Sequence, residues 1–234
     1  MTAAAPLTMD ARKRAAALAA LELIQDGMQL GFGTGSTVAH LLGAIAERGV
    51  DVAGVPTSEA TAAYCRELGI QLLHPSEVER LDLAIDGADE LDRTLTATKG
   101  GGGALLREKV VAAMSERFVV IATSDKLVER LGDSFPLPIE VVPFADGPVT
   151  RRLRDRGYEV ELRTAGEGPV VVTDNGNHLL DARMVGGIED PAVEELWIAS
   201  LPGVVECGLF VDLVDQALLA DEHGQVVQLQ PALD

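Results

Sequence analysis

The feature that most constrains the fold is the regular alternation of short apolar runs with amphipathic helical segments over the first half of the chain. Helical patterns occupy residues 10–25, 36–49, 57–69 and 105–114. Apolar runs typical of strands lie at 28–32, 51–55, 70–73, 81–86 and 118–123. The last run, FVVIAT, is continuously apolar, as in strands buried on both faces. The alternation predicts an α/β fold, a Rossmann-like open and mostly parallel sheet with helices on both faces.

The pattern changes after Gly132. The segment 135–144, FPLPIEVVPF, contains three prolines and predicts an edge strand or a linker. The elements expected beyond it are a helix at 149–156, strands at 158–163 and 170–173, an Asn175–Gly176 turn, a strand from 178, a helix at 191–200 and a strand at 204. This order is typical of a smaller α+β, ferredoxin-like domain. We expect a Rossmann-like catalytic domain at 1–133, rejoined by 208–234, and the smaller domain at 134–207.

The charge balance argues against two classes of partner. With 19 basic and 37 acidic side chains, the net charge of −18 disfavours nucleic acid and anionic membrane surfaces. No apolar run approaches the ~20 residues of a membrane-spanning helix. Cys65 and Cys207 belong to no CxxC pair or Cys/His cluster, so we expect free thiols in a reducing compartment. The expected protein is cytoplasmic, with no nucleic-acid or membrane partner.

The glycine-rich turn GTGST, Gly33 to Thr37, joins an expected strand to an expected helix. Its glycines let several N–H groups point inward at a helix N-terminus, and its hydroxyls add further donors, a combination that suits a phosphate. The turn lacks the Gly-Lys pair of a P-loop, and Ser36 stands where a dinucleotide fingerprint needs glycine. The alternative is a tight strand-to-helix turn with a Ser or Thr cap.

A second polar stretch runs from Asp86 to Glu108. It carries Asp86 and Asp89 after a strand, Lys99 beside four glycines, and Glu108 about one turn into a helix. Carboxylates can bind sugar hydroxyls or transfer protons, while glycine amides and a lysine can stabilise an oxyanion. We therefore predict a site in this stretch.

Other interpretations of these residues remain open. Asp86, Asp89 and Glu108 could bind a hard metal ion. Asp89 and Glu90 could be solvated turn residues, and Glu108 an acid favoured near a helix N-terminus. Lys126, which follows the FVVIAT strand, is either a phosphate ligand or a solvated surface charge.

Taken together, five motifs resemble the type A ribose-5-phosphate isomerase family in the same order along nearly the whole chain: GTGST, DGADE, KGGGGALLREK, ATSDK and VVTDNGN. The resemblance implies a Rossmann-like domain joined to a smaller α+β domain and a sugar-phosphate substrate. It also implies a homodimer or homotetramer that needs no metal or other cofactor. The implied reaction interconverts D-ribose 5-phosphate and D-ribulose 5-phosphate through an enediolate, in the non-oxidative pentose phosphate pathway.

The resemblance also implies a role for each matching residue. Asp86 and Asp89 would contact the sugar, with Asp86 aiding ring opening, and Glu108 would be the base. The expected oxyanion-binding residues are Lys99, Gly100, Gly101, Gly102 and Gly103. The expected phosphate-binding residues are Thr34, Gly35, Ser36, Thr37, Lys126 and Lys13, with Arg12 and Arg14 as alternatives to Lys13.

Three other functions compete with isomerisation. A non-catalytic sugar-phosphate sensor would need a DNA-reading module, for which the first helix is too short and the charge is of the wrong sign. A CoA-transferase-like enzyme would use Glu108 as a nucleophile and form a covalent thioester. A dinucleotide-dependent dehydrogenase is disfavoured by Ser36, which breaks the glycine fingerprint.

Overall fold

The computed structural model describes residues 6–231, which form two compact units. Of the described residues, 6–88, 107–126 and 212–231 form the first unit. The second comprises Asp89–Leu106 and Leu127–Val211. None of the helices within residues 6–231 is long and apolar enough to cross a membrane.

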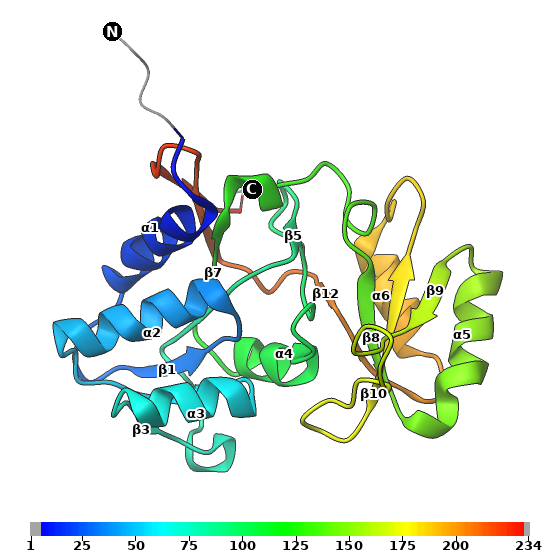
Figure 1. Ribbon diagram of the computed structural model, residues 1–234, viewed down its shortest axis with the longest axis horizontal. Helices are drawn as coiled ribbons and strands as arrows, with labels where there is room; N and C mark the ends of the chain where they lie inside the picture. The colour runs from blue at the N-terminus through cyan, green and yellow to red at the C-terminus, as the bar shows by residue number, and fades with distance from the viewer. Residues whose placement is uncertain (1–5, 232–234) are drawn as a thin grey trace, which may run out of the picture. The chain divides into compact units, whose positions relative to one another are not determined.

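The first unit contains a seven-stranded sheet in the order β14-β13-β7-β4-β1-β2-β3, of which Figure 1 labels β1, β3 and β7. The strands are β1 (Gln29–Phe32), β2 (Ala53–Pro56), β3 (Gln71–Leu72), β4 (Leu83–Asp86), β7 (Phe118–Thr123), β13 (Gln216–Ala220) and β14 (Val226–Leu229). All neighbouring pairs are parallel except β13 with β14. The predicted open, mostly parallel sheet is confirmed.

Helices cover both faces of this sheet. Helices α1 (Met9–Leu21), α2 (Ser36–Arg48) and α3 (Glu59–Glu67) share one hydrophobic cluster with Leu30 and Phe32 of β1. Gly31 lies between these two residues and therefore faces the other side of the sheet. There, Val111 of α4 (Leu105–Ala113) lies 2.4 Å from the position of a Cβ on residue 31, so only glycine allows this close packing.

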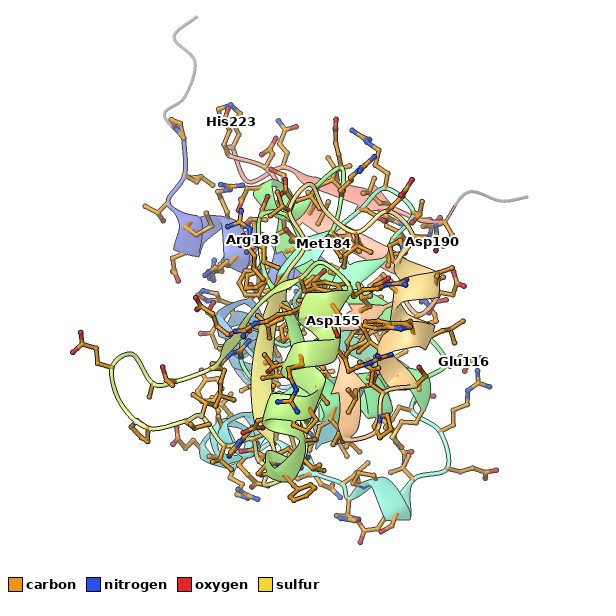
Figure 2. The ribbon with its side chains drawn as sticks, turned by 90° about the vertical axis from the view of Figure 1, so that its right-hand side faces the viewer. Glu116, Asp155, Arg183, Met184, Asp190 and His223 are labelled. Atoms are coloured by element: carbon orange, nitrogen blue, oxygen red, sulfur yellow. The ribbon has the colours of Figure 1, made fainter. Side chains whose placement is uncertain are left out.

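The second unit contains a four-stranded antiparallel sheet in the order β11-β8-β10-β9. Its elements are β8 (Leu137–Val141), α5 (Asp146–Asp155), β9 (Glu159–Leu162), β10 (His178–Arg183), α6 (Pro191–Ala199) and β11 (Val204–Cys207). This βαββαβ order with antiparallel pairing is the predicted ferredoxin-like arrangement. Figure 2 shows α5, which ends at Asp155, and the end of β10 at Arg183.

A small three-stranded sheet completes the second unit. Its strands β5 (Glu90–Leu91), β6 (Ala97–Thr98) and β12 (Leu209–Phe210) lie in the order β12-β6-β5. Residues 89–106, which we expected in the Rossmann-like domain, therefore group with the second unit. Three short 3₁₀ helices, η1 (Pro75–Glu77), η2 (Ser124–Lys126) and η3 (Pro143–Ala145), complete the described elements.

The expectation that 135–144 is an edge strand or linker was wrong. Strand β8 is fully buried and pairs with both β10 and β11. Proline is tolerated because the carbonyl of Pro138 faces the end of β11, where it accepts a hydrogen bond from Gly208 N–H at 2.8 Å. The N–H and C=O of a residue in an antiparallel strand point to the same side, so the N–H that Pro138 lacks would also face this end of β11. There it falls beyond Cys207, the last residue of β11, and no bond of the sheet is lost.

The expected strand at 170–173 is also absent from the described structure. Only isolated bridges connect Val170 to Thr164 and Val172 to His178. The Asn175–Gly176 turn does form: Thr173 N–H donates to Asn177 O at 2.8 Å, and Gly176 adopts φ of 81°.

Candidate functional site

The GTGST turn leaves β1 and enters α2 in a conformation that requires two of its glycines. A Cβ on residue 33 would lie 2.1 Å from the carboxylate carbon of Asp86, so no side chain fits there. Gly35 adopts φ of 124°, a region that favours glycine. The turn therefore brings its backbone into direct contact with the end of β4.

Asp86, the last residue of β4, is oriented by this turn. Its Oδ1 accepts hydrogen bonds from Thr34 N–H at 3.0 Å and from Gly87 N–H at 2.7 Å. The residue is only 3% exposed. Two fixed donors thus hold a buried carboxylate beside the glycine-rich turn.

A cluster of hydroxyl groups after the neighbouring strand β2 and at the start of α3 supports the turn. Thr34 Oγ1 lies 2.8 Å from Thr57 Oγ1 and donates to Ser58 Oγ at 2.8 Å. Thr61 Oγ1 donates to the carbonyl of Gly33 at 3.0 Å. These three residues were not among those predicted from the sequence. The available signal was position: TSEAT directly follows a strand that neighbours β1, so both strand ends lie at one sheet edge.

The structure distinguishes Lys13 from its basic neighbours. Lys13 Nζ donates to Ser36 Oγ at 2.9 Å. Arg12 instead donates to Asp125 Oδ1 at 2.7 Å and to Asp221 O at 3.1 Å, while Arg14 is exposed. Burial alone would raise the pKa of Asp125, but hydrogen bonds from Thr123 and the backbone, together with Arg12, hold it below its usual value. Lys13 is therefore the cation of this group that reaches the turn.

The turn borders a cavity of about 300 Å³ within the first unit. Residues 33–36 form one part of its lining, and α2 and α3 contribute the apolar remainder with Thr61 and Tyr64. Hydroxyl and amide groups at one end of an apolar pocket are typical of small-molecule sites.

Glu108 lies at the same edge of the first unit. It is 4% exposed and one helical turn before Val111, the residue that packs against Gly31. Because a helix that connects parallel strands runs antiparallel to them, Glu108 is nearer the strand C-termini than Val111 is. Lys126 follows β7, which pairs with β4, so Lys126 also lies at this edge.

The second unit carries Lys99 and the glycine loop 100–103. Lys99 is 2% exposed, and its Nζ lies 5.4 Å from the ring centroid of Phe210, a cation–π distance. Gly100 and Gly103 adopt φ of 101° and 83°. Gly101 N–H donates to Asp89 Oδ2 at 2.7 Å. Asp89 therefore braces the loop instead of being only a solvated turn residue.

The polar stretch 86–108 is divided between the two units. The chain leaves the first unit after Ala88 and returns to it at Arg107. Asp86 and Glu108 belong to the first unit, whereas Asp89, Lys99 and the glycine loop belong to the second. Each of the three carboxylates lies within three residues of a crossing point.

Glu90 has a structural role. We considered it a solvated acid, but it is buried and accepts hydrogen bonds from three backbone N–H groups. The donors are Gly132 at 2.7 Å, Ser134 at 3.1 Å and Phe135 at 2.8 Å. These bonds fix the connection that leads into β8.

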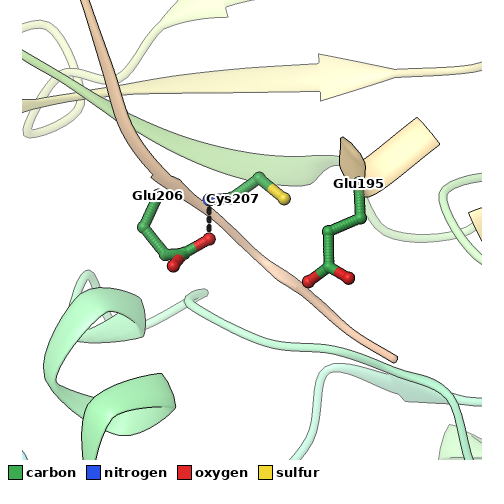
Figure 3. Close-up of side chains that lie close together, drawn as sticks. All are labelled: Glu195, Glu206 and Cys207. Atoms are coloured by element: carbon green, nitrogen blue, oxygen red, sulfur yellow. Dashed lines mark hydrogen bonds between the residues drawn. The ribbon is translucent and has the colours of Figure 1, made fainter. Parts of the chain in front are cut away.

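One group of side chains within residues 6–231 has ligand atoms close enough together to hold a metal ion: Glu195, Glu206 and Cys207 (Figure 3). An oxygen of Glu206 accepts a hydrogen bond from Cys207 N–H at 2.8 Å. The group includes none of the residues expected to bind substrate.

Comparison with known proteins identifies the family. Residues 53–224 match the family model described as ribose 5-phosphate isomerase A (phosphoriboisomerase A). Ribose-5-phosphate isomerase A of Caulobacter vibrioides is 49% identical over 231 residues, covering 96% of this chain and 100% of the relative. The chain belongs to the ribose 5-phosphate isomerase A family. Ribose-5-phosphate isomerase A of Rhodopseudomonas palustris is 48% identical over 222 residues, covering 91% of this chain and 94% of the relative.

Solved structures of the ribose 5-phosphate isomerase family share the fold. Ribose 5-phosphate isomerase A from Neisseria gonorrhoeae has a TM-score of 0.91 and 37% identity, covering 97% of this chain and 100% of that one. A D-ribose-5-phosphate isomerase in complex with phospho-erythronic acid has a TM-score of 0.91 and 36% identity, covering 96% and 100%. The predicted enzyme class, a ribose-5-phosphate isomerase, is confirmed, and it takes the place of the sensor, CoA-transferase and dehydrogenase alternatives.

Proposed function

We propose that this isomerase interconverts D-ribose 5-phosphate and D-ribulose 5-phosphate without a metal ion, by proton transfer through an enediolate. The observation that carries the proposal is the buried carboxylate of Glu108, held at the same sheet edge as Asp86 and the GTGST turn. A base shielded from water by neighbouring structure suits abstraction of a carbon-bound proton. Phospho-erythronic acid, bound in the solved relative, is itself a phosphorylated four-carbon acid.

The phosphate group is assigned to the first unit. The hydroxyls and amides of residues 34–37 would donate to its oxygens, and Lys13 and Lys126 would supply positive charge. The contact between Lys13 and Ser36 supports this assignment. These local cations and amides must overcome the field of a chain with net charge −18.

The remaining residues are assigned to the chemical steps. Asp86 assists opening of the sugar ring, and Asp89 binds a sugar hydroxyl. Glu108 takes the proton from C2 and returns it to C1, while the hydroxyl proton moves from O2 to O1. Lys99 and the amides of Gly100–Gly103 stabilise the negative oxygen of the enediolate.

The substitution that tests the base is Glu108→Gln, which keeps the shape of the side chain but cannot accept the proton. Turnover should fall by ~100-fold or more, while binding of inorganic phosphate as a competitive inhibitor stays near the wild-type value. Glu47→Gln, on the exposed side of α2, is the matched control and should keep full turnover. Near-normal turnover in Glu108→Gln would exclude Glu108 as the base.

The assembly and the cellular location remain predictions of the sequence and the family resemblance. We expect a homodimer or homotetramer in the cytoplasm. Sedimentation of the purified enzyme at micromolar concentration would distinguish the two assemblies from a monomer.

A further inference from the structure

Arg163, which follows β9 in the second unit, contacts the glycine loop directly. Its Nη1 donates to the carbonyl of Gly100 at 3.1 Å and to that of Gly101 at 3.1 Å. The rest of the guanidinium binds Asp181 of β10: Nε donates to Oδ2 at 2.8 Å, and Nη2 pairs with Oδ1. The side chain of Arg163 is only 15% exposed. One fixed guanidinium therefore holds two consecutive carbonyl groups of the loop.

These contacts determine the direction of the peptide group between Gly100 and Gly101. The C=O and N–H of a trans peptide point in opposite directions. Here the C=O points to Arg163, while the N–H donates to Asp89 Oδ2 at 2.7 Å. Gly103 N–H also donates to Gly100 O at 2.9 Å. The peptide is thus held from both sides.

The same contact acts on the next peptide group. Because the carbonyl of Gly101 is held on Arg163, the N–H of Gly102 points away from the guanidinium. Glycine has no side chain to restrict rotation, so a run of four glycines needs such external bonds to keep its amides in one direction.

We infer that Arg163, fixed by Asp181, is a positioning residue that holds the Gly100–Gly103 loop in one conformation, so that the N–H of Gly102 is directed toward the oxyanion of the reaction. The inference rests on the oxyanion role proposed above for this loop. A peptide that flips would present its carbonyl oxygen where a donor is needed, which would repel the developing negative charge. Arginine suits the task because its planar fork serves two carbonyls and a carboxylate at once, which a lysine ammonium does not.

The test compares Arg163→Ala and Arg163→Lys with a matched control. Arg156 of the same unit forms a similar pair with Glu194, with Nε–Oε1 and Nη2–Oε2 distances of 3.3 and 3.0 Å. Arg156→Ala therefore removes an arginine–carboxylate pair of the same kind. We expect Arg163→Ala to lower kcat by ~10- to 100-fold with KM for ribose 5-phosphate within about threefold of wild type. Arg156→Ala should leave kcat unchanged.

Two further measurements separate positioning from simple stabilisation. Added guanidinium should restore part of the lost kcat in Arg163→Ala but none in Glu108→Gln. Hydrogen exchange at the amides of 100–103 should accelerate in Arg163→Ala, with exchange in 33–37 unchanged. If Arg163→Ala folds poorly, Arg163→Lys serves in its place. This variant keeps the positive charge, and its kcat should also fall, but by a smaller factor.

The inference is overturned if kcat of both Arg163 variants equals that of the Arg156 control. It is also overturned if loop exchange is unchanged, or if KM rises in proportion to the loss of kcat/KM. These failures are distinct from failure of the proposed mechanism. An impaired Glu108→Gln with intact Arg163 variants rejects only the positioning role. An active Glu108→Gln with impaired Arg163 variants rejects only the assigned base.

Discussion

Gly33 allows Asp86 to take its position, because a glycine has no side chain that would occupy the space of the carboxylate. A Cβ at this position would overlap the carboxylate at 2.1 Å, so Asp86 can accept the Thr34 and Gly87 amides only while residue 33 is glycine. The sequence predicted both the turn and the aspartate, because the turn follows one apolar run and the aspartate ends another. It did not predict their contact, which depends on β1 and β4 being neighbours in the sheet.

Gly33→Ala should therefore displace the Asp86 carboxylate and lower kcat/KM for ribose 5-phosphate by at least ~10-fold. The control is Gly43→Ala in α2, where a Cβ would meet only the hydroxyl of Tyr64 at 3.7 Å. That substitution should keep activity and leave stability unchanged or slightly raised, because alanine favours a helix. Steady-state kinetics with thermal melts would measure both effects, and equal activities in the two variants would contradict this account of Gly33.

At the scale of elements, β8 shows where local patterns fail. Its prolines predicted an edge strand, yet it is the strand on which both β10 and β11 pair. Long-range pairing overrides a local signal here because Pro138 falls where β11 ends. In the first unit the strand–helix alternation predicted the sheet correctly. Parallel neighbours must be joined by a crossover, and an amphipathic crossover helix is visible in the sequence as a local pattern.

Glu140 links β8 to the VVTDNGN motif. The residue is 0% exposed. Its Oε1 accepts hydrogen bonds from Thr173 Oγ1 at 2.9 Å, Asn175 Nδ2 at 3.0 Å and Asn177 Nδ2 at 2.8 Å. A motif that the resemblance noted without a role thus serves to close the turn over a buried carboxylate.

Removal of this carboxylate in Glu140→Ala should lower the free energy of unfolding by about 2–4 kcal/mol, because three donors lose their acceptor inside the unit. Glu159→Ala, at an exposed position of β9, should change it by less than ~0.5 kcal/mol. Urea unfolding at pH 7 would measure both. A Glu140→Ala variant as stable as the Glu159 control would show that the buried hydrogen bonds do not stabilise the turn.

At the scale of the whole molecule, the proposed chemistry uses residues from both units. The chain crosses between them after residues 88, 106, 126 and 211. Sequence patterns placed 89–106 with the strands that precede it, because β5 and β6 are only two residues each, and β6 pairs with β12 more than 100 positions later. No local periodicity reports such a pairing. The motifs were predictable because each is defined by a few residues that are adjacent in the sequence.

The measurement that tests the mechanism most directly is conversion of ribose 5-phosphate in D₂O containing EDTA. Transfer of a proton through Glu108 predicts the same rate with and without EDTA in D₂O, and deuterium at C1 of the ribulose 5-phosphate formed, because a carboxyl proton exchanges with solvent during the enediolate's lifetime. The Glu108→Gln variant should lose both turnover and label. Activity that disappears in EDTA and returns with a divalent ion would contradict metal independence, and product that forms without deuterium would contradict proton transfer through a carboxylate that exchanges with solvent.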